Sequence, residues 1–250
     1  MGMVRQMADH QSKGEERRPD TIVPSFRPGC TKVLIVEDEP LFRDLLKTTL
    51  CSYGQIQVVG AVDNGIDAIE LAEETLPDVI LMDIELGSEP DGIRAAHQIK
   101  AANPAVGIVI LSMHREKEYL ASLPESRAAG WSYMLKQSLR DKDALIRAIE
   151  GSSWGLVTID PALLESLKPR SRSVLERLTR PQLTVLEKIA AGYSDAAISE
   201  QMGIDSASLA RLTALVYEDL AIPTDGPTDP RVKVTLLYLN ETTTTGNNVS

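Results

Sequence analysis

The sequence predicts an α/β amino-terminal domain with a doubly wound, five-stranded parallel sheet, followed by a small all-α domain. Two observations predict this order. Five short apolar runs alternate with helical patterns between residues 32 and 150, whereas residues 174–240 show helical periodicity only. With 250 residues and 43% apolar content, the chain is long and apolar enough to bury a core in each domain.

The first domain contains five strand-and-helix units. The expected strands are 32–36, 56–62, 78–82, 106–111 and 131–135, and the helices that follow them are 40–53, 64–75, 91–102, 115–129 and 140–150. Near-continuous apolar strands require cover on both faces of a sheet, and right-handed crossovers place helices on both. Pro124 is expected to kink or break the fourth helix, because proline removes a helical hydrogen bond.

The remaining segments differ in composition. Residues 1–31 are polar and proline-containing, which predicts a flexible leader, and 241–250 are expected to form a disordered tail. Residues 151–173 are read as a linker in which Asp160-Pro161 opens a short helix and a Pro/Ser/Arg stretch serves as a tether. The helices expected within 174–240 are 181–191, 195–202, 206–219 and 229–239.

Composition also restricts the class of protein. The first twenty residues carry charges throughout, so neither a signal peptide nor a membrane span is predicted, and a cytoplasmic location without membrane contact is expected. Cys30 and Cys51 have no metal-ligand spacing and form no disulfide framework. The net charge of −10 repels nucleic acid unless a basic patch is segregated on one surface.

Polar residues follow the predicted strands at one edge of the sheet. Asp83 closes the third apolar run, and the pair Glu37-Asp38 closes the first. Parallel strands deliver their carboxyl ends to the same edge, where such acids repel one another unless a cation such as Mg²⁺ neutralises them. Ser112 and Lys136 end two further runs, and a hydroxyl and an ammonium there suit the oxygens of a phosphoryl group.

Residues 32–150 resemble the receiver domain of two-component response regulators, which has a flavodoxin-like fold. The matching motifs are Val33-Leu-Ile-Val-Glu-Asp-Glu-Pro40, Asp78-Val-Ile-Leu-Met-Asp83, Asp91-Gly-Ile93 and Tyr133-Met-Leu-Lys136. The resemblance implies that a partner histidine kinase transfers a phosphoryl group to Asp83. It implies no enzyme activity beyond Mg²⁺-dependent self-phosphorylation and dephosphorylation at Asp83.

The same resemblance assigns the remaining roles. Lys136 and Ser112 would contact the phosphoryl oxygens, and Ser112 and Tyr133 would form the conformational switch. The implied Mg²⁺ ligands are the side chains of Glu37, Asp38 and Asp83 and the backbone carbonyl of Glu85.

Residues 174–240 contain the motifs Leu178-Thr-Arg-Pro-Gln-Leu-Thr-Val-Leu186, Ala190-Ala-Gly-Tyr-Ser-Asp-Ala-Ala-Ile198 and Met202-Gly-Ile204. On these motifs the segment resembles the LuxR-type helix-turn-helix domain, and the whole arrangement resembles the NarL/FixJ group. The resemblance implies that helix 206–219 is the DNA recognition helix. Its candidate DNA contacts are Ser206, Ser208, Arg211 and Thr213. The domain is atypical because residues 174–250 contain six basic and ten acidic residues, and phosphate neutralisation supplies most non-specific DNA affinity.

Three functions are compatible with these features. The favoured one is a transcription regulator that dimerises when Asp83 is phosphorylated and binds DNA through paired helix-turn-helix domains. The second keeps the switch but uses the acidic helical domain for protein–protein interaction or dimerisation. The third, an aspartyl-phosphate enzyme, is disfavoured because Glu85 is the only candidate for its second acid.

Overall fold

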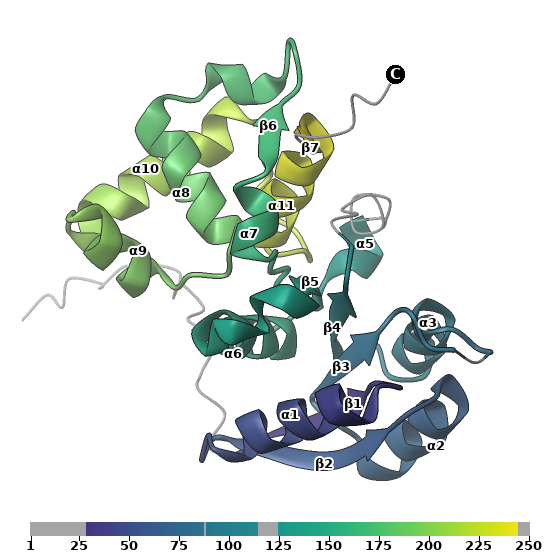
Figure 1. Ribbon diagram of the computed structural model, residues 1–250. Helices are drawn as coiled ribbons and strands as arrows, with labels where there is room; N and C mark the ends of the chain where they lie inside the picture. The colour runs from purple at the N-terminus through teal and green to yellow at the C-terminus, as the bar shows by residue number, and fades with distance from the viewer. Residues whose placement is uncertain (1–28, 88, 115–124, 245–250) are drawn as a thin grey trace, which may run out of the picture.

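The computed structural model describes residues 29–87, 89–114 and 125–244, and it contains the predicted five-stranded parallel sheet (Figure 1). Across the sheet, the strands are β2 Ile56–Val62, β1 Thr31–Val36, β3 Val79–Asp83, β4 Gly107–Ser112 and β5 Trp131–Leu135. Each neighbouring pair is parallel, so all five carboxyl ends lie at one edge. The predicted fold class of the first domain is confirmed.

Helices cover both faces of the sheet because its side chains alternate between two apolar layers. Val33 and Ile35 belong to a cluster with helices α1 (Pro40–Cys51) and α6 (Lys142–Ser153). The intervening strand residues face α2 (Gly65–Thr75) and α3 (Gly92–Ala102). Of the predicted helix 115–129, residues 115–124 lie outside the described residues, and the described part contains the short α5 (Glu125–Ala128). A 3₁₀ turn, η1 (Lys136–Arg140), precedes α6 where the sequence predicted one continuous helix from 140.

The second domain is built from helices, as the sequence predicted. Its helices are α7 Pro161–Leu164, η2 Val174–Arg177, α8 Arg180–Ala190, α9 Asp195–Met202, α10 Ser206–Asp219 and α11 Pro230–Glu241. Local capping starts several of them: Gln182 accepts from the Thr179 amide at 2.8 Å, and Asp205 accepts from the Ser208 amide at 2.8 Å. Their apolar sides meet in a buried core that includes Val185, Ile198 and Leu209.

The carboxyl-terminal residues differ from the expectation of a disordered tail beginning at 241. Thr242–Thr244 form strand β7, which pairs antiparallel with β6 (Leu167–Pro169). Strand β6 lies where the sequence predicted part of a tether. Local composition suggested an irregular chain in both β6 and β7. The two segments are ordered by pairing with each other across about 75 residues of sequence. Local composition does not reveal such a non-local contact.

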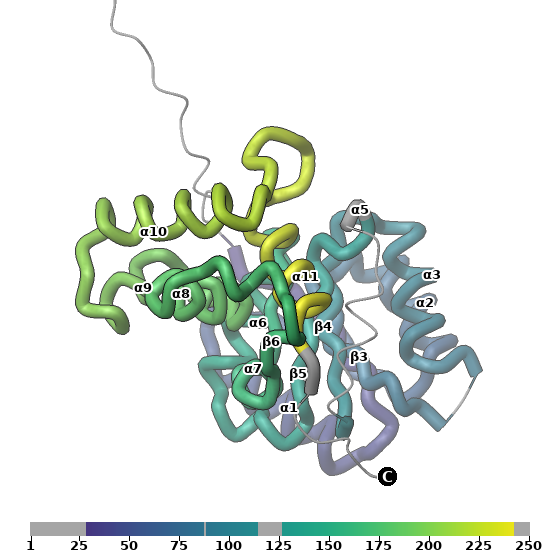
Figure 2. The backbone as a smooth tube through the Cα atoms, turned by 90° about the horizontal axis from the view of Figure 1, so that it is seen from above, coloured from purple at the N-terminus to yellow at the C-terminus, as the bar shows by residue number. Residues whose placement is uncertain are grey.

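The chain between the two domains packs onto the sheet. Ile159 forms a parallel bridge with Tyr133 beside the outer edge of β5, and its amide donates to the Ala190 carbonyl at 2.8 Å. The Arg147 guanidinium lies 4.2 Å from the centre of the Tyr193 ring. Figure 1 shows the second domain on the β5 side of the sheet, away from β2, and Figure 2 gives the view from above, with α7 and β6 near β5. The two domains therefore share an apolar core through this junction.

Within the described parts of the chain, every helix is too short or too polar to cross a membrane.

Candidate functional site

The acids predicted to meet at one edge of the sheet do meet there. Glu37 directly follows β1 and Asp83 ends β3, and both carboxylates are buried, whereas Asp38 is exposed. Val36 pairs with Met82 in the sheet, so the next residue on each strand lies at the same level. One oxygen from each of Glu37, Asp38 and Asp83 lies within 4.8 Å of the other two. This proximity concentrates negative charge at the carboxyl edge.

Lys136 is the cation of this cluster. It begins η1 directly after β5, and its Nζ lies 2.9 Å from Glu37 Oε1 and 2.9 Å from Asp83 Oδ2. The same Nζ lies 5.0 Å from the centre of the Phe42 ring. Two buried carboxylates share one ammonium, and together with Asp38 the four side chains carry two more negative charges than positive ones. A divalent cation would balance them.

The pKa values of Glu37 and Lys136 are both raised, for different reasons. Burial raises the pKa of Glu37, and the charge of Asp83 adds to that increase against the opposing hydrogen bond from Lys136. Burial alone would lower the pKa of Lys136, but its hydrogen bonds to Glu37 and Asp83 outweigh burial and raise it. Lys136 is therefore a fixed positive charge across the neutral pH range.

Backbone and arginine contacts hold the acids in place. The Glu85 amide donates to Asp83 Oδ1 at 3.0 Å, and the Gly87 amide donates to Asp38 Oδ2 at 3.2 Å. Arg43 donates from Nη1 to the Glu37 carbonyl at 2.5 Å. Among the described residues, nothing hydrogen-bonds the buried Oε2 of Glu37. A buried carboxylate oxygen without a donor suits a metal ligand, so the donor set fits Mg²⁺.

Ser112 and Tyr133 are both bound to the backbone of His114. Ser112 ends β4 with its hydroxyl buried, and its Oγ accepts from the His114 amide at 3.0 Å. The Tyr133 hydroxyl donates to the His114 carbonyl at 2.7 Å, and the ring is buried. The His114 side chain reaches Glu85, with Nε2 2.9 Å from Oε1. One backbone unit thus connects the two expected switch residues.

The structure brings together four of the predicted site residues, Glu37, Asp38, Asp83 and Lys136, and places Ser112 at the same edge. Sequence reasoning missed two contacts of the site. The Arg43 guanidinium binds the Glu37 carbonyl, and the His114 backbone binds Ser112 and Tyr133. Each contact uses a backbone group, which every residue carries, so no residue type at that position marks it. It also missed the role of Asp160, which it read only as the start of a helix. Asp160 caps α7 as predicted, but it contacts β5 as well.

The four candidate DNA contacts lie on α10, in the second domain. Ser206 and Arg211 are exposed, and Ser208 and Thr213 are half-buried. Ser208 also donates from Oγ to Asp205 Oδ2 at 3.0 Å, within the helix cap. At the other end of α10, Asp219 Oδ2 accepts from Gln182 Nε2 at 2.6 Å, so this acid serves packing between helices.

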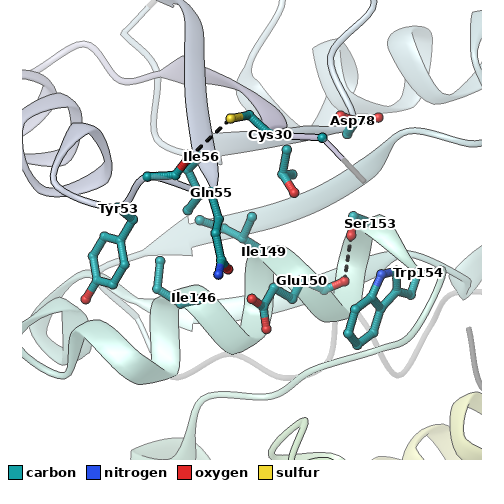
Figure 3. A pocket seen from close by; sticks show the side chains of 13 residues that line it. Cys30, Tyr53, Gln55, Ile56, Asp78, Ile146, Ile149, Glu150, Ser153 and Trp154 are labelled. Carbon is teal, nitrogen blue, oxygen red and sulfur yellow. Dashed lines mark hydrogen bonds between the residues drawn. The ribbon is translucent and has the colours of Figure 1, made fainter. Parts of the chain in front are cut away.

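A cavity of about 510 Å³ lies at the opposite, amino-terminal end of the sheet (Figure 3). It is bounded by the start of β1, the loop before β2 and the last turns of α6, with Tyr53, Glu150 and Trp154 in its wall. Burial raises the pKa of Glu150. The lysine and the three clustered acids do not line this cavity. We therefore assign the functional site to the carboxyl edge.

Comparison with known proteins agrees with this geometry. A family model described as the response regulator receiver domain matches residues 33–150. The transcriptional regulatory protein DegU of Brevibacillus brevis is 30% identical over 194 residues, which cover 69% of this chain and 80% of that protein. The transcriptional regulatory protein MctR of Rhizobium johnstonii is 32% identical over 178 residues, covering 71% and 81%.

A solved structure is similar as well. The two-component response regulator of the LuxR family from Aurantimonas sp. matches with 28% identity and a TM-score of 0.48, covering 55% of this chain and 94% of that one. The DegU and MctR matches cover about four fifths of each relative and more than two thirds of this chain, which is more than the receiver domain alone. The chain therefore belongs to the two-component response regulators of the NarL/FixJ type, a family of transcription regulators.

Proposed function

We propose that this protein regulates transcription by accepting a phosphoryl group on Asp83 from a histidine kinase. The observation that carries the proposal is the contact of Lys136, whose side chain is 9% exposed, with two buried carboxylates at the strand ends, 2.9 Å from each. Lys136 binds one oxygen of the Asp83 carboxylate. The other oxygen accepts, among the described residues, from the Glu85 amide alone, so it is available for attack on phosphorus.

In the proposed transfer, an Asp83 oxygen attacks the phosphorus of a phosphohistidine. The new P–O bond forms as the P–N bond breaks, and the departing imidazole takes up a proton from solvent or from its own protein. Lys136 offsets the negative charge on the phosphoryl oxygens during the transfer. The Asp83 carboxylate itself becomes an acyl phosphate, which later hydrolyses.

The site residues would hold Mg²⁺ through the side chains of Glu37, Asp38 and Asp83 and the backbone carbonyl of Glu85. When bound, the ion would neutralise phosphoryl charge during transfer. The unpartnered Oε2 of Glu37 and the excess of acid over base at this edge support this choice of ligands. The amides of Glu85 and Gly87 keep the Asp83 and Asp38 carboxylates in fixed orientations.

Ser112 and Tyr133 would read the state of Asp83. After transfer, the Ser112 hydroxyl would give up the His114 amide and donate to a phosphoryl oxygen. Because the Tyr133 hydroxyl binds the carbonyl of the same residue, a movement of this backbone unit would reach β5 and the surface beyond it. A local charge change would thus bias a two-state element.

The output would be DNA binding by a dimer, with α10 as the recognition helix. The relatives DegU and MctR are transcriptional regulatory proteins, which supports this output over a purely protein-binding one. Ser206, Ser208, Arg211 and Thr213 would contact DNA, with Arg211 as the only base on α10. One base gives little phosphate neutralisation, so two copies bound at paired half-sites would be needed for useful affinity.

Phosphorylation tests the first part of the proposal. The purified protein is incubated with acetyl phosphate and Mg²⁺, and the acyl phosphate is followed by its mobility in a phosphate-affinity gel. We expect a modified band that requires Mg²⁺ and disappears in Asp83→Asn, while Asp78→Asn, a neighbouring aspartate at the other end of β3, retains it. Equal modification of Asp83→Asn would overturn the proposal.

DNA binding tests the second part. The protein is treated with beryllofluoride and Mg²⁺ as a phosphoryl mimic, and a pool of duplex DNA of random sequence is selected on it at low salt. We expect enrichment of paired half-sites, together with a shift to dimers in light scattering, and loss of the enrichment in Arg211→Ala. Failure to retain any DNA at low salt would overturn the DNA-binding part and favour the protein-interaction alternative.

A further inference from the structure

The segment just before α7 extends the sheet beyond β5. The Tyr133 amide donates to the Thr158 carbonyl at 2.9 Å, and the Asp160 amide donates to the Tyr133 carbonyl at 2.9 Å. These bonds place the chain alongside the outer edge of β5, whose other edge pairs with β4. The residues that follow the receiver-domain match at 33–150 therefore take part in the same sheet as the phosphorylation site.

Asp160 ends this segment with a fully buried side chain. Its Oδ2 accepts from the Leu135 amide at 2.8 Å, and its Oδ1 accepts from the Ser138 hydroxyl at 3.1 Å and from the Ala162 amide at 2.7 Å. Leu135 and Ser138 lie on either side of Lys136 in the sequence. The carboxylate thus binds the chain immediately before Lys136 and two residues after it.

A helix cap alone does not require this arrangement. Asp229 provides the comparison: it also precedes a proline at the start of a helix and accepts from the amide two residues later, at 2.7 Å, but it is exposed. Burying a carboxylate costs free energy that one cap bond does not repay. The additional donors from Leu135 and Ser138 compensate the charge of Asp160 and, in return, fix the backbone that carries Lys136.

We propose that Asp160 is a positioning residue for Lys136: by accepting from the Leu135 amide before it and the Ser138 hydroxyl after it, Asp160 holds the Lys136 ammonium against Asp83 for phosphoryl transfer. The inference rests on the proposed function, because it concerns the same site. Transfer is sensitive to position, since misplacing a reacting group by about 1 Å can cost on the order of a hundredfold in rate.

Asp160 also connects this position to the second domain. The residue before it, Ile159, donates its amide to the Ala190 carbonyl at the end of α8, at 2.8 Å. Two consecutive residues therefore bind β5 on one side and α8 on the other. The placement of Lys136 is in this way tied to the domain that carries α10.

The test compares Asp160→Asn with Asp229→Asn, its matched control, in the full-length protein. The measured quantity is the rate at which Asp83 is modified by acetyl phosphate at saturating Mg²⁺. We expect Asp160→Asn to be slower by about tenfold and Asp229→Asn to be unchanged within about twofold. If Asp160 acted only through its charge, Asp160→Asn would be modified faster, because removing a negative charge near the site favours the approach of an anionic phosphodonor.

A double-mutant cycle with Lys136→Met separates positioning from a general structural role. If Asp160 acts through Lys136, adding Asp160→Asn to Lys136→Met should change the remaining rate by less than about twofold, whereas independent effects would multiply. Melting curves verify folding. If Asp160→Asn does not unfold cooperatively, Ser138→Ala replaces it as the test variant. Ser138→Ala removes a single hydrogen bond to Asp160 and should slow modification of Asp83 about threefold.

The outcomes are distinguishable. A folded Asp160→Asn protein that is modified at the wild-type rate, or effects that multiply in the cycle, would overturn the positioning role and leave the proposed function intact. Absence of modification in the wild-type protein would overturn the proposed function itself.

Discussion

Lys136 and Asp83 are 53 residues apart in the sequence, yet the lysine Nζ lies 2.9 Å from the aspartate Oδ2 in an almost fully buried pair. Lys136 contacts Glu37 at the same distance. The local charge balance therefore depends on one side chain. Buried carboxylates are tolerated only when they are paired, so this contact has consequences for stability as well as for chemistry.

Replacing Lys136 should destabilise the fold. Lys136→Met leaves Glu37 and Asp83 buried without their cation, and loss of one partner of a buried ion pair typically costs about 3–5 kcal/mol. Urea unfolding in the absence of divalent cations measures the loss. Lys142→Met, at an exposed lysine on α6, is the control and should change stability by less than about 0.5 kcal/mol. Equal midpoints for the two variants would contradict the structural importance of the pair.

Mg²⁺ should stabilise the protein, and Asp83 should be necessary for most of that effect. A ligand that binds only the folded state at about 100 times its Kd adds about 2.7 kcal/mol. We therefore expect the melting temperature of the wild type to rise with Mg²⁺ concentration. The melting temperature of Asp83→Asn should rise much less, because this variant lacks one charge of the acidic cluster. Asp44→Asn, at an exposed aspartate on α1, should respond like the wild type. A wild-type protein indifferent to Mg²⁺ would argue against the metal site.

Sequence reasoning found the acidic edge because its physical basis is regular. Strands β1 and β3 are continuous apolar runs, and parallel strands bring their carboxyl ends to one edge of the sheet, so Glu37 and Asp83 are predicted to meet at that edge. Lys136 follows from the same rule applied to β5. Most of the helices were predictable for a similar reason, since they have a local apolar period and several, such as α2, α3 and α9, begin with a side-chain cap.

The junction between the domains was not predictable in this way. The segment before Asp160 contains no long apolar run, and its role comes from bonds to Tyr133 and Ala190, which are distant in sequence. Strand β7 depends likewise on pairing with β6, so the polar residues after Glu241 read as a tail. Composition describes a segment's own preference, whereas these segments are ordered by partners elsewhere in the chain.

The close contact at this junction predicts an effect of Gly192. Gly192 has φ +78°, and an added Cβ would lie 2.7 Å from the Thr158 side chain. Gly203 has φ +65° with no atom near its added Cβ, so it is a matched control for backbone strain. We expect Gly203→Ala to cost about 1 kcal/mol of unfolding free energy. Gly192→Ala should cost a further 1–3 kcal/mol or so, because overpacking adds to the same strain.

Removing the obstructing side chain should restore most of that additional loss. In a protein that already carries Thr158→Ala, adding Gly192→Ala should lower the free energy of unfolding by only about as much as Gly203→Ala lowers it in the wild type. Thr158 is suited to the test because its buried Oγ1 has no hydrogen-bond partner among the described residues, so the substitution breaks no bond of the hydroxyl. Chemical denaturation of the four proteins measures the cycle. An unchanged difference would show that Gly192 does not contact Thr158.

Lys100 should make stability depend on pH in the alkaline range. Its Nζ donates to the Val106 carbonyl, and burial lowers its pKa from 10.5 to about 8. Between these values the unfolded chain binds a proton that the folded protein has lost, so the contribution of Lys100 to stability rises with pH from about 8 to about 10.5. Lys100→Met should lack this rise, by an amount on the order of 1 kcal/mol.

Tyr217 also titrates in the alkaline range. Burial raises its pKa to about 12, so it opposes the trend above pH 10. It does so equally in the wild type and in Lys100→Met, so the difference in stability between these two proteins isolates Lys100. Urea midpoints measured at several pH values between 7 and 10 provide that difference, with Lys47→Met, at an exposed lysine on α1, as the control that should follow the wild type. Parallel curves for Lys100→Met and the wild type would show that the ammonium is solvated in the folded protein.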